Sequence, residues 1–371
     1  MKRTALGALH AARGAQWREY QGWEIPAVYS SLRQEYEALQ EGVGLIDLSW
    51  RSRLLITGRD RRSWLHGQVT QEINGLEEGR GAYATILTPQ GRMVADMRVY
   101  ALPDALLADV PSGNEPPIAE YLDRFLIMER AEIEDVSESW AQLSLQGPLS
   151  PCALTPVLGP ELAGLAYWAI APAQFEGTQL YVARVPHCGE DGFDLFVPSD
   201  RAAALWSALC EHRAAFAVHS VGWEALNVRR LEAGIPWWGE ELDDTLVPLE
   251  ARLEHAISLH KGCYVGQEII ARIDARGHVN NLLAGFYVEG ERLPERGTEI
   301  HHGGKRVGKV RTALHSLRLA RPVALGYLRR ELQEPGTQVE AVTSTGPIAL
   351  TVTQLPFVPH DQAPHDCPPA E

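Results

Sequence analysis

A cysteine between two glycines marks the segment of this chain best suited to chemistry. Lys261, Gly262 and Cys263 open the octapeptide KGCYVGQE, which ends at Glu268. If the backbone is extended here, Lys261 and Cys263 project from one face, and a nearby ammonium favours thiolate over thiol. A nucleophilic, redox or transiently metal-binding thiol fits this composition, and so does a tight turn with a small buried cysteine. Cys263 is therefore a candidate reactive residue, with Lys261 as its activating group.

A second candidate is the acidic stretch HCGEDGFD at positions 187–194. Gly and Asp are typical turn residues, so an acidic turn is one interpretation. Asp194, however, falls on the strand that follows, where a carboxylate can accept two hydrogen bonds from a planar amino-pyrimidine edge. That edge would belong to a pterin or a purine.

The third candidate is Asp96, which lies inside an otherwise apolar strand predicted over 93–102. The alternation of a strand places Asp96, Arg98 and Tyr100 on one face. A solvent-facing ion pair and a partly buried carboxylate both fit this pattern. In the second case Asp96 is a general base, or it orients a protonated amine.

The elements around these residues predict an α+β protein. Between about 51 and 140 the pattern follows the order β-α-β-β-α-β, which is typical of a ferredoxin-like domain. A second α+β stretch runs from 141 to about 234, and it contains the strand that carries Asp194. Beyond residue 284 six short apolar strands, separated by Gly and Pro turns, predict a small barrel.

Composition excludes several other classes. The chain has 371 residues, 45% of them apolar, and a net charge of −14, so a field generally attractive to nucleic acid or anionic lipid is absent. The five cysteines contain no CxxC pair, which argues against a zinc knuckle. The start of the chain lacks the apolar stretch of a secretory signal, and no apolar run is long enough for a bilayer. We expect a cytoplasmic protein without nucleic-acid or membrane partners and without a resident metal.

The octapeptide also resembles the signature K-G-C-Y-x-G-Q-E of the folate-binding YgfZ proteins, which are relatives of the glycine cleavage T-protein (aminomethyltransferase). Looser similarity to that superfamily extends over about 42–359. It includes the segments GVGLIDLS from Gly42, GEDGFD from Gly189, LEAG from Leu231 and PFVP from Pro356.

This resemblance implies a three-domain clover-leaf fold with ferredoxin-like α+β domains, a C-terminal β-barrel, and tetrahydrofolate in the central hole. The predicted division is 1–50 with 141–250 as one discontinuous domain, 51–140 as a second, 251–283 as the connection that carries the signature, 284–359 as the barrel and 360–371 as a tail.

The resemblance also assigns residues. The superfamily's folate-contacting and catalytic aspartate matches Asp96, and its pterin-contacting glutamate matches Asp194, which is one carbon shorter. Tyr83 matches a tyrosine of the pocket wall, and Cys263 with Lys261 matches the pair specific to YgfZ proteins.

The implied function is support of iron–sulfur cluster assembly or repair, and through it of tRNA-modifying cluster enzymes, with iron–sulfur proteins or assembly factors as partners. Two substrate contacts of the T-protein are absent, because its arginine and tyrosine align with Leu226 and Gln362. An aminomethyltransferase of the glycine cleavage system and a non-catalytic folate-binding scaffold are the alternatives.

Overall fold

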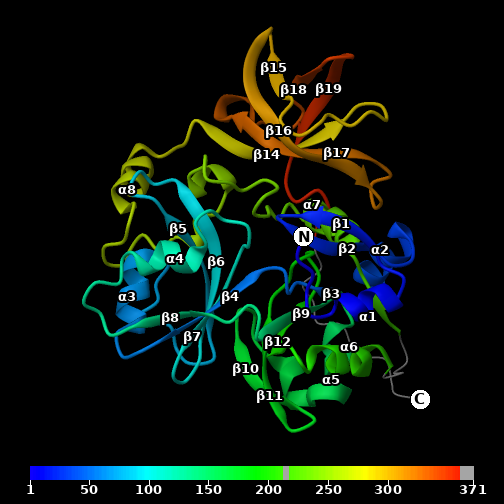
Figure 1. Cartoon of the computed structure of the whole chain (residues 1–371). Coiled ribbons are helices and arrows are strands. Elements are labelled where there is room, and N and C mark those ends of the chain that lie inside the picture. The colour runs from blue at the N-terminus through cyan, green and yellow to red at the C-terminus, as the bar shows by residue number, and fades with distance from the viewer. Residues whose placement is uncertain (212–216, 360–371) are drawn as a thin grey trace.

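A computed structural model describes residues 1–211 and 217–359 of the chain. Two α+β regions lie side by side and a β-barrel lies against both of them, so the three regions surround a common centre (Figure 1). The predicted tail over 360–371 lies outside the described residues. The predicted domain borders stay predictions.

The first α+β region is a five-stranded sheet in the order β5-β6-β7-β4-β8. Its elements are β4 (Ser52–Thr57), α3 (Arg61–Gln68), β5 (Gly81–Leu87), β6 (Met93–Ala101), β7 (Leu106–Val110), α4 (Ile118–Asp123) and β8 (Glu132–Asp135). One face of β6, with Ala95, Met97 and Val99, is buried in an apolar core together with side chains of α3 and α4. The alternate face carries Asp96, Arg98 and Tyr100.

The strand β7 corrects the predicted order of elements in this region. A ferredoxin-like unit has four strands, whereas β7 is a fifth strand that pairs with both β4 and β6. It was missed because it is only five residues long and follows β6 after a short turn, so the two strands give one apolar pattern. The addition matters because β7 carries Asp109.

The second α+β region is a six-stranded sheet in the order β10-β11-β12-β9-β3-β13. Its strands are β3 (Val43–Asp47), β9 (Trp140–Gln146), β10 (Ile170–Phe175), β11 (Thr178–Arg184), β12 (Gly192–Pro198) and β13 (Val218–Ser220). Its helices are α2 (Leu32–Glu41), α5 (Ser150–Leu158), α6 (Ala202–Glu211) and α7 (Trp223–Glu232), and the N-terminal segment adds α1 (Gly7–Ala12), β1 (Gln16–Tyr20) and β2 (Trp23–Val28). The two sheets meet through aromatic side chains, among them Tyr100 and Phe196, whose ring centroids are 5.9 Å apart.

The C-terminal region is a closed barrel of six strands, which confirms the predicted barrel. The strands are β14 (Asn281–Val288), β15 (Glu299–His302), β16 (Lys305–Ser316), β17 (Arg321–Arg329), β18 (Gln338–Thr343) and β19 (Gly346–Thr353). Closure pairs β14 with both β17 and β19, and it leaves no free sheet edge.

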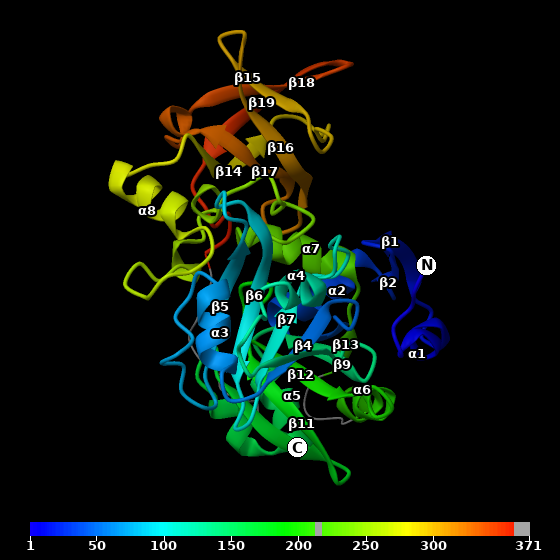
Figure 2. The ribbon, with the colours of Figure 1, turned by 60° about the vertical axis from the view of Figure 1, so that its left-hand side comes forward.

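The connection between the α+β regions and the barrel lies beside β5, the edge strand of the five-stranded sheet, as the turned view shows (Figure 2). It contains two short 3₁₀ turns and α8 (Gln267–Arg276). An apolar cluster joins all three regions here, because Leu87 of β5, Leu231 of α7 and Leu325 of β17 are buried together. Among the described residues no helix is long and apolar enough to cross a membrane.

Candidate functional site

Asp96 lies at the junction of the two α+β regions, on the strand face from which Tyr100 contacts Phe196, and one of its two carboxylate oxygens has no hydrogen-bond partner. It is on β6 opposite Thr85 of β5, and its side chain is buried, with 4% exposure. Tyr83 donates its hydroxyl to Oδ2 at 3.2 Å, while the buried Oδ1 has no hydrogen-bond partner. The position is therefore a buried carboxylate rather than a solvent-facing one. A buried oxygen without a donor is costly in an apo protein and points to a donor on a ligand or on water.

Tyr83, the hydrogen-bond donor to Asp96, packs against two other aromatic rings. Its ring stacks on His255 at 5.5 Å and lies 5.8 Å from the ring of Trp168. Burial raises the pKa of its phenol well above the usual value, and the neighbouring Asp96 raises it further. Tyr83 therefore stays protonated and acts as a hydrogen-bond donor, as the wall position assigned to it requires.

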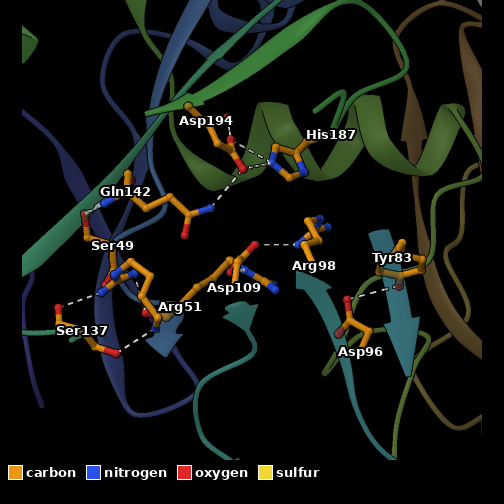
Figure 3. A network of polar contacts seen from close by, with 12 residues as sticks. Ser49, Arg51, Tyr83, Asp96, Arg98, Asp109, Ser137, Gln142, His187 and Asp194 are labelled. Carbon is orange, nitrogen blue, oxygen red and sulfur yellow. Dashed lines mark hydrogen bonds and ion pairs between the residues drawn. The ribbon is translucent and has the colours of Figure 1, made fainter. Parts of the chain in front are cut away.

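Arg98 does not pair with Asp96, although the two share a strand face. Its Nη1 donates to Asp109 Oδ2 at 2.9 Å, and Arg51 Nε donates to Asp109 Oδ1 at 2.6 Å. Figure 3 shows Asp109 between the two arginines, with Asp96 and Tyr83 beyond Arg98. Burial alone would raise the pKa of Asp109, but the two guanidinium groups more than offset it and hold that pKa below its ordinary value.

Trp237 forms an aromatic wall shared by these groups. The guanidinium carbons of Arg51 and Arg98 lie 5.4 Å and 5.8 Å from its ring centroid, within cation–π distance. The ring of His187 meets it edge-on at 5.7 Å. Trp237 thus joins the basic groups of the five-stranded sheet to the acidic segment of the six-stranded one.

Asp194 is fully occupied by the protein itself. Its Oδ1 accepts from Ser144 Oγ at 2.6 Å and its Oδ2 from Gln142 Nε2 at 3.0 Å, while His187 Nε2 lies within 3.0 Å of both oxygens. The side chain is completely buried. The predicted double acceptor for a ligand edge is therefore already engaged in this structure, because His187 and the neighbouring strand β9 supply the donors that a ligand would otherwise bring.

Gln142 has a hydrogen-bond acceptor without a partner, whereas both oxygens of Asp194 are engaged. Because its amide nitrogen faces Asp194, its Oε1 points away from that carboxylate, and it is buried without a partner. Other buried polar atoms of the same junction also lack a partner, namely Arg51 Nη2, Arg98 Nε, Tyr100 Oη and Trp237 Nε1. Donors and acceptors are thus both unsatisfied, which fits a ligand that carries both kinds of group.

The octapeptide KGCYVGQE is not among the groups around Asp96, and its Lys261 lies against the C-terminal end of α3. Lys261 is buried, and its ammonium donates to the carbonyls of His66, of Val69 at 2.6 Å and of Gln71 at 2.9 Å. A lysine in this position caps the free carbonyls at the end of a helix. Burial lowers the pKa of this ammonium to about 8. Lys261 therefore anchors the connection to the first α+β region.

Cys263 and Lys261 do not share a face, which corrects the expectation from an extended backbone. The segment turns instead of forming a strand, so Lys261 is buried whereas Cys263 is exposed. Gly266 fixes this course, because its φ is +82° and a Cβ there would come within 2.6 Å of the Thr88 carbonyl oxygen. The thiol is thereby held at the surface, where a partner can reach it.

The comparisons with known proteins agree with this architecture and identify the class. Residues 6–261 match the model of the GCVT N-terminal domain, and residues 282–359 match the model of the glycine cleavage T-protein C-terminal barrel domain. The chain is a two-part α+β protein with a C-terminal barrel, and it belongs to the aminomethyltransferase (glycine cleavage T-protein) family.

Individual relatives cover almost the whole chain. An aminomethyltransferase of Streptomyces coelicolor is 32% identical over 96% of this chain and 97% of its own length. One of Rubrobacter xylanophilus is 33% identical over 96% of this chain and 94% of its own. The crystal structure of aminomethyltransferase T from Bartonella henselae has the same fold, with a TM-score of 0.88 at 23% identity over 97% of this chain and 99% of that one. The expected clover-leaf fold is thereby confirmed, and the family uses tetrahydrofolate.

Sequence reasoning named Tyr83, the hydrogen-bond partner of Asp96, but it missed most of the other polar groups of this junction. It considered Arg98 only as an ion-pair partner of Asp96, and it did not single out Trp237. Arg51, Asp109 and Gln142 carried no motif, and only their polar character inside apolar strands could have marked them. Of the two missing substrate contacts, Leu226 lies in an apolar core of α7, and Gln362 lies outside the described residues.

Proposed function

We propose that this chain binds tetrahydrofolate at the junction around Asp96 and transfers a one-carbon unit of the aminomethyl type. The observation that carries the proposal is Asp96 itself, a buried carboxylate with one oxygen held by Tyr83 and the other without a donor. Membership of the aminomethyltransferase family supports it. Bound tetrahydrofolate would supply the nitrogen that accepts the one-carbon unit.

The chain's own residues would bind and orient this group. Asp96 accepts a hydrogen bond from an N–H of the ligand, or takes its proton, through the free Oδ1. Tyr83 keeps Asp96 in place by donating to Oδ2, and Trp168 and His255 support the Tyr83 ring. Gln142 offers an acceptor whose direction is set by Asp194.

Calorimetric titration with tetrahydrofolate tests the proposal directly. We expect micromolar or tighter binding by the wild type and at least tenfold weaker binding by Asp96→Asn. Asp200→Asn is the matched control, because Asp200 is 80% exposed and lies on the surface. No binding by the folded wild type would refute the proposal.

The aminomethyl step has a separate assay. With an aminomethyl-lipoyl carrier protein and tetrahydrofolate, a transferase releases ammonia and forms methylene-tetrahydrofolate. We expect this activity to depend on Asp96. If tetrahydrofolate binds but ammonia is not released, the folate-binding part of the proposal is kept. The aminomethyl-lipoyl group is then refuted as the one-carbon donor.

A second candidate function is that of the YgfZ proteins, and the exposed thiol of Cys263 within KGCYVGQE favours it. In this function the folate-bound protein supports iron–sulfur cluster assembly or repair, and Cys263 contacts the cluster protein or its assembly factor. The test is rescue of cluster-enzyme activity in cells that lack the protein. Full rescue by Cys263→Ala would contradict a role for the thiol. A non-catalytic folate-binding scaffold would then be the remaining explanation of such rescue.

A further inference from the structure

A cavity separate from the groups around Asp96 lies between the N-terminal segment, the turn that joins β1 to β2, and the segment that follows β7. Its volume is about 1120 Å³, which is enough for a small-molecule ligand. Gln21 of the turn lines it, and so do Ser112 and Asn114 after β7, whereas Tyr83 and Asp96 do not. A ligand in this cavity would therefore not contact the candidate folate site.

Three polar side-chain atoms in the wall of this cavity are buried and have no hydrogen-bond partner among the described residues. They are Gln21 Oε1, Ser112 Oγ and Asn114 Oδ1. The three residues lie together, because Gly113 packs so closely on Gln21 that a Cβ at position 113 would come within 3.1 Å of the Gln21 Cβ. Ser112 as a whole is only 7% exposed. Buried polar atoms are normally satisfied, so three unsatisfied ones in one wall indicate a missing partner.

The nitrogen atoms of the two amides fix their orientation. Gln21 Nε2 donates to the Trp238 carbonyl at 3.1 Å, and Asn114 Nδ2 donates to the Val94 carbonyl at 2.8 Å. A flipped amide would set oxygen against oxygen, so the two unpartnered amide atoms are acceptors. The Ser112 hydroxyl carries a hydrogen that it can donate. The wall thus offers two acceptors and one donor.

The backbone holds Gln21 in this wall at a cost. Its φ is +49° and that of Gly22 is +81°, which is the conformation of a two-residue hairpin turn. Such a turn favours Asn or Gly at its first position, and the left-handed conformation is unfavourable for a larger side chain. Gly239 makes room for the glutamine, because a Cβ there would overlap Gln21 Nε2. Strain of this kind is typical of residues whose side chains have a function.

The charged residues of the cavity select no net charge in a ligand. Lys2 and Arg3 bring positive charge to the lining, and Glu115, Asp135 and Glu138 bring negative charge. A cation and an anion would each meet groups of their own sign, whereas a neutral ligand would not. The unpartnered hydrogen-bonding atoms therefore define the ligand better than charge does.

We propose that this cavity binds a small molecule with a primary carboxamide group. The two N–H donors of a carboxamide match Gln21 Oε1 and Asn114 Oδ1, and its oxygen can accept from the Ser112 hydroxyl. An ester lacks these donors, and a carboxylate would set its oxygens against two acceptors. Trp23 and Trp140 also line the cavity, and their indole rings suit a flat ring in the rest of the ligand. The proposal does not depend on folate binding.

Nicotinamide, methyl nicotinate and nicotinate test the proposal on the wild-type protein, because they share one ring and differ only in the polar group. Binding is measured by ligand-detected NMR and by calorimetry. We expect nicotinamide to bind with a dissociation constant on the order of 1 mM or lower, as befits its small size. Its affinity should exceed that of the ester and of the acid by about tenfold, the effect of one or two hydrogen bonds.

Variants then assign this preference to the wall. Ser112→Ala removes a hydroxyl that has no partner among the described residues, so it should not lower thermal stability but should weaken nicotinamide binding by about threefold to tenfold. Asn114→Ala should remove the preference for the amide. Ser199→Ala is the matched control, because Ser199 lines the same cavity while its hydroxyl already donates to the Glu138 carbonyl at 2.8 Å. If Asn114→Ala does not fold, Ser112→Ala and the three probes decide.

Tetrahydrofolate separates this cavity from the candidate folate site. Nicotinamide should bind with the same affinity when tetrahydrofolate is present, and displacement would place the probe at the folate site and overturn the proposal. Equal affinities for the three probes, an amide preference that survives both Ser112→Ala and Asn114→Ala, or no binding of nicotinamide would also overturn it. Failure of tetrahydrofolate to bind refutes the proposed function, but the comparison of the three probes still tests the carboxamide site.

Discussion

Asp96 and Asp194 are two buried aspartates on neighbouring sheets, and they differ in what their oxygens already hold. Asp194 accepts hydrogen bonds on both oxygens from Ser144, Gln142 and His187. Asp96 accepts one, from Tyr83, and leaves the other oxygen free. Both were expected to contact a ligand, yet only Asp96 has capacity left for one.

The difference separates a ligand-binding carboxylate from one that shapes the site. The bonds of Asp194 fix the amide of Gln142, whose free oxygen then points away from it, so Asp194 acts on a ligand through its neighbour. A satisfied polar network of this kind contributes rigidity, whereas an unsatisfied oxygen costs stability until a ligand binds. Substitutions at the two positions should therefore affect different properties.

We expect the largest effect from Asp194→Ala, which should lower the free energy of unfolding. This change leaves His187, Ser144 and Gln142 without their common acceptor in the interior, and breaking a buried charge network costs about 3–5 kcal/mol. Urea unfolding should show a loss of that size in the free energy of unfolding. A loss below about 1 kcal/mol, together with abolished folate binding, would mean that Asp194 contacts the ligand directly.

Unfolding at acid pH should reveal the contribution of Asp109 to the free energy of unfolding, which we expect to be smaller than that of Asp194. Because the pKa of Asp109 is lowered in the folded protein from its ordinary 3.8, the stability it contributes is complete above about that pH. It is lost as the pH falls further toward the folded-state pKa, where protonation removes the charge between Arg51 and Arg98. The free energy of unfolding, measured between pH 5 and about 2.5, should fall more steeply in the wild type than in Asp109→Asn. Parallel curves would contradict the charge arrangement.

Asp96→Asn should show the opposite balance to Asp194→Ala. The amide oxygen can still accept from Tyr83, so the free energy of unfolding should change by less than about 1 kcal/mol. The affinity for tetrahydrofolate should nevertheless fall at least tenfold, as measured by calorimetry. A large stability loss with unchanged affinity would reverse the roles assigned to the two aspartates.

The sequence predicted the barrel, the two helices of the first α+β region and the strand face that carries Asp96. These features depend on local periodicity and on turn residues, which a single sequence displays. It missed β7, because a five-residue strand directly after a hairpin turn gives no separate signal. With β7 it missed Asp109, and so the partner of both arginines.

The candidate site was predicted only in part, because its contacts join distant segments. Arg51 and Asp109 are 58 positions apart, and Gln142 and Asp194 are 52 apart. No spacing rule connects such residues before the sheets are paired. The segment around Cys263 differs, because its motif was evident in the sequence. Its backbone conformation, however, depends on contacts with α3 that the sequence did not predict.

The smallest stability effect is expected from Cys263→Ala, which extends the comparison to an exposed group. Cys263 is on the surface, so its loss should change the free energy of unfolding by less than about 0.5 kcal/mol and leave tetrahydrofolate affinity unchanged. Its neighbour Lys261 provides the contrast, because Lys261→Met leaves three carbonyls without their donor and should lower thermal stability clearly. If Cys263→Ala weakened folate binding as Asp96→Asn does, the thiol would belong to the central site. Loss of cluster-enzyme support with unchanged folding and folate affinity would instead assign Cys263 to a partner that meets this surface.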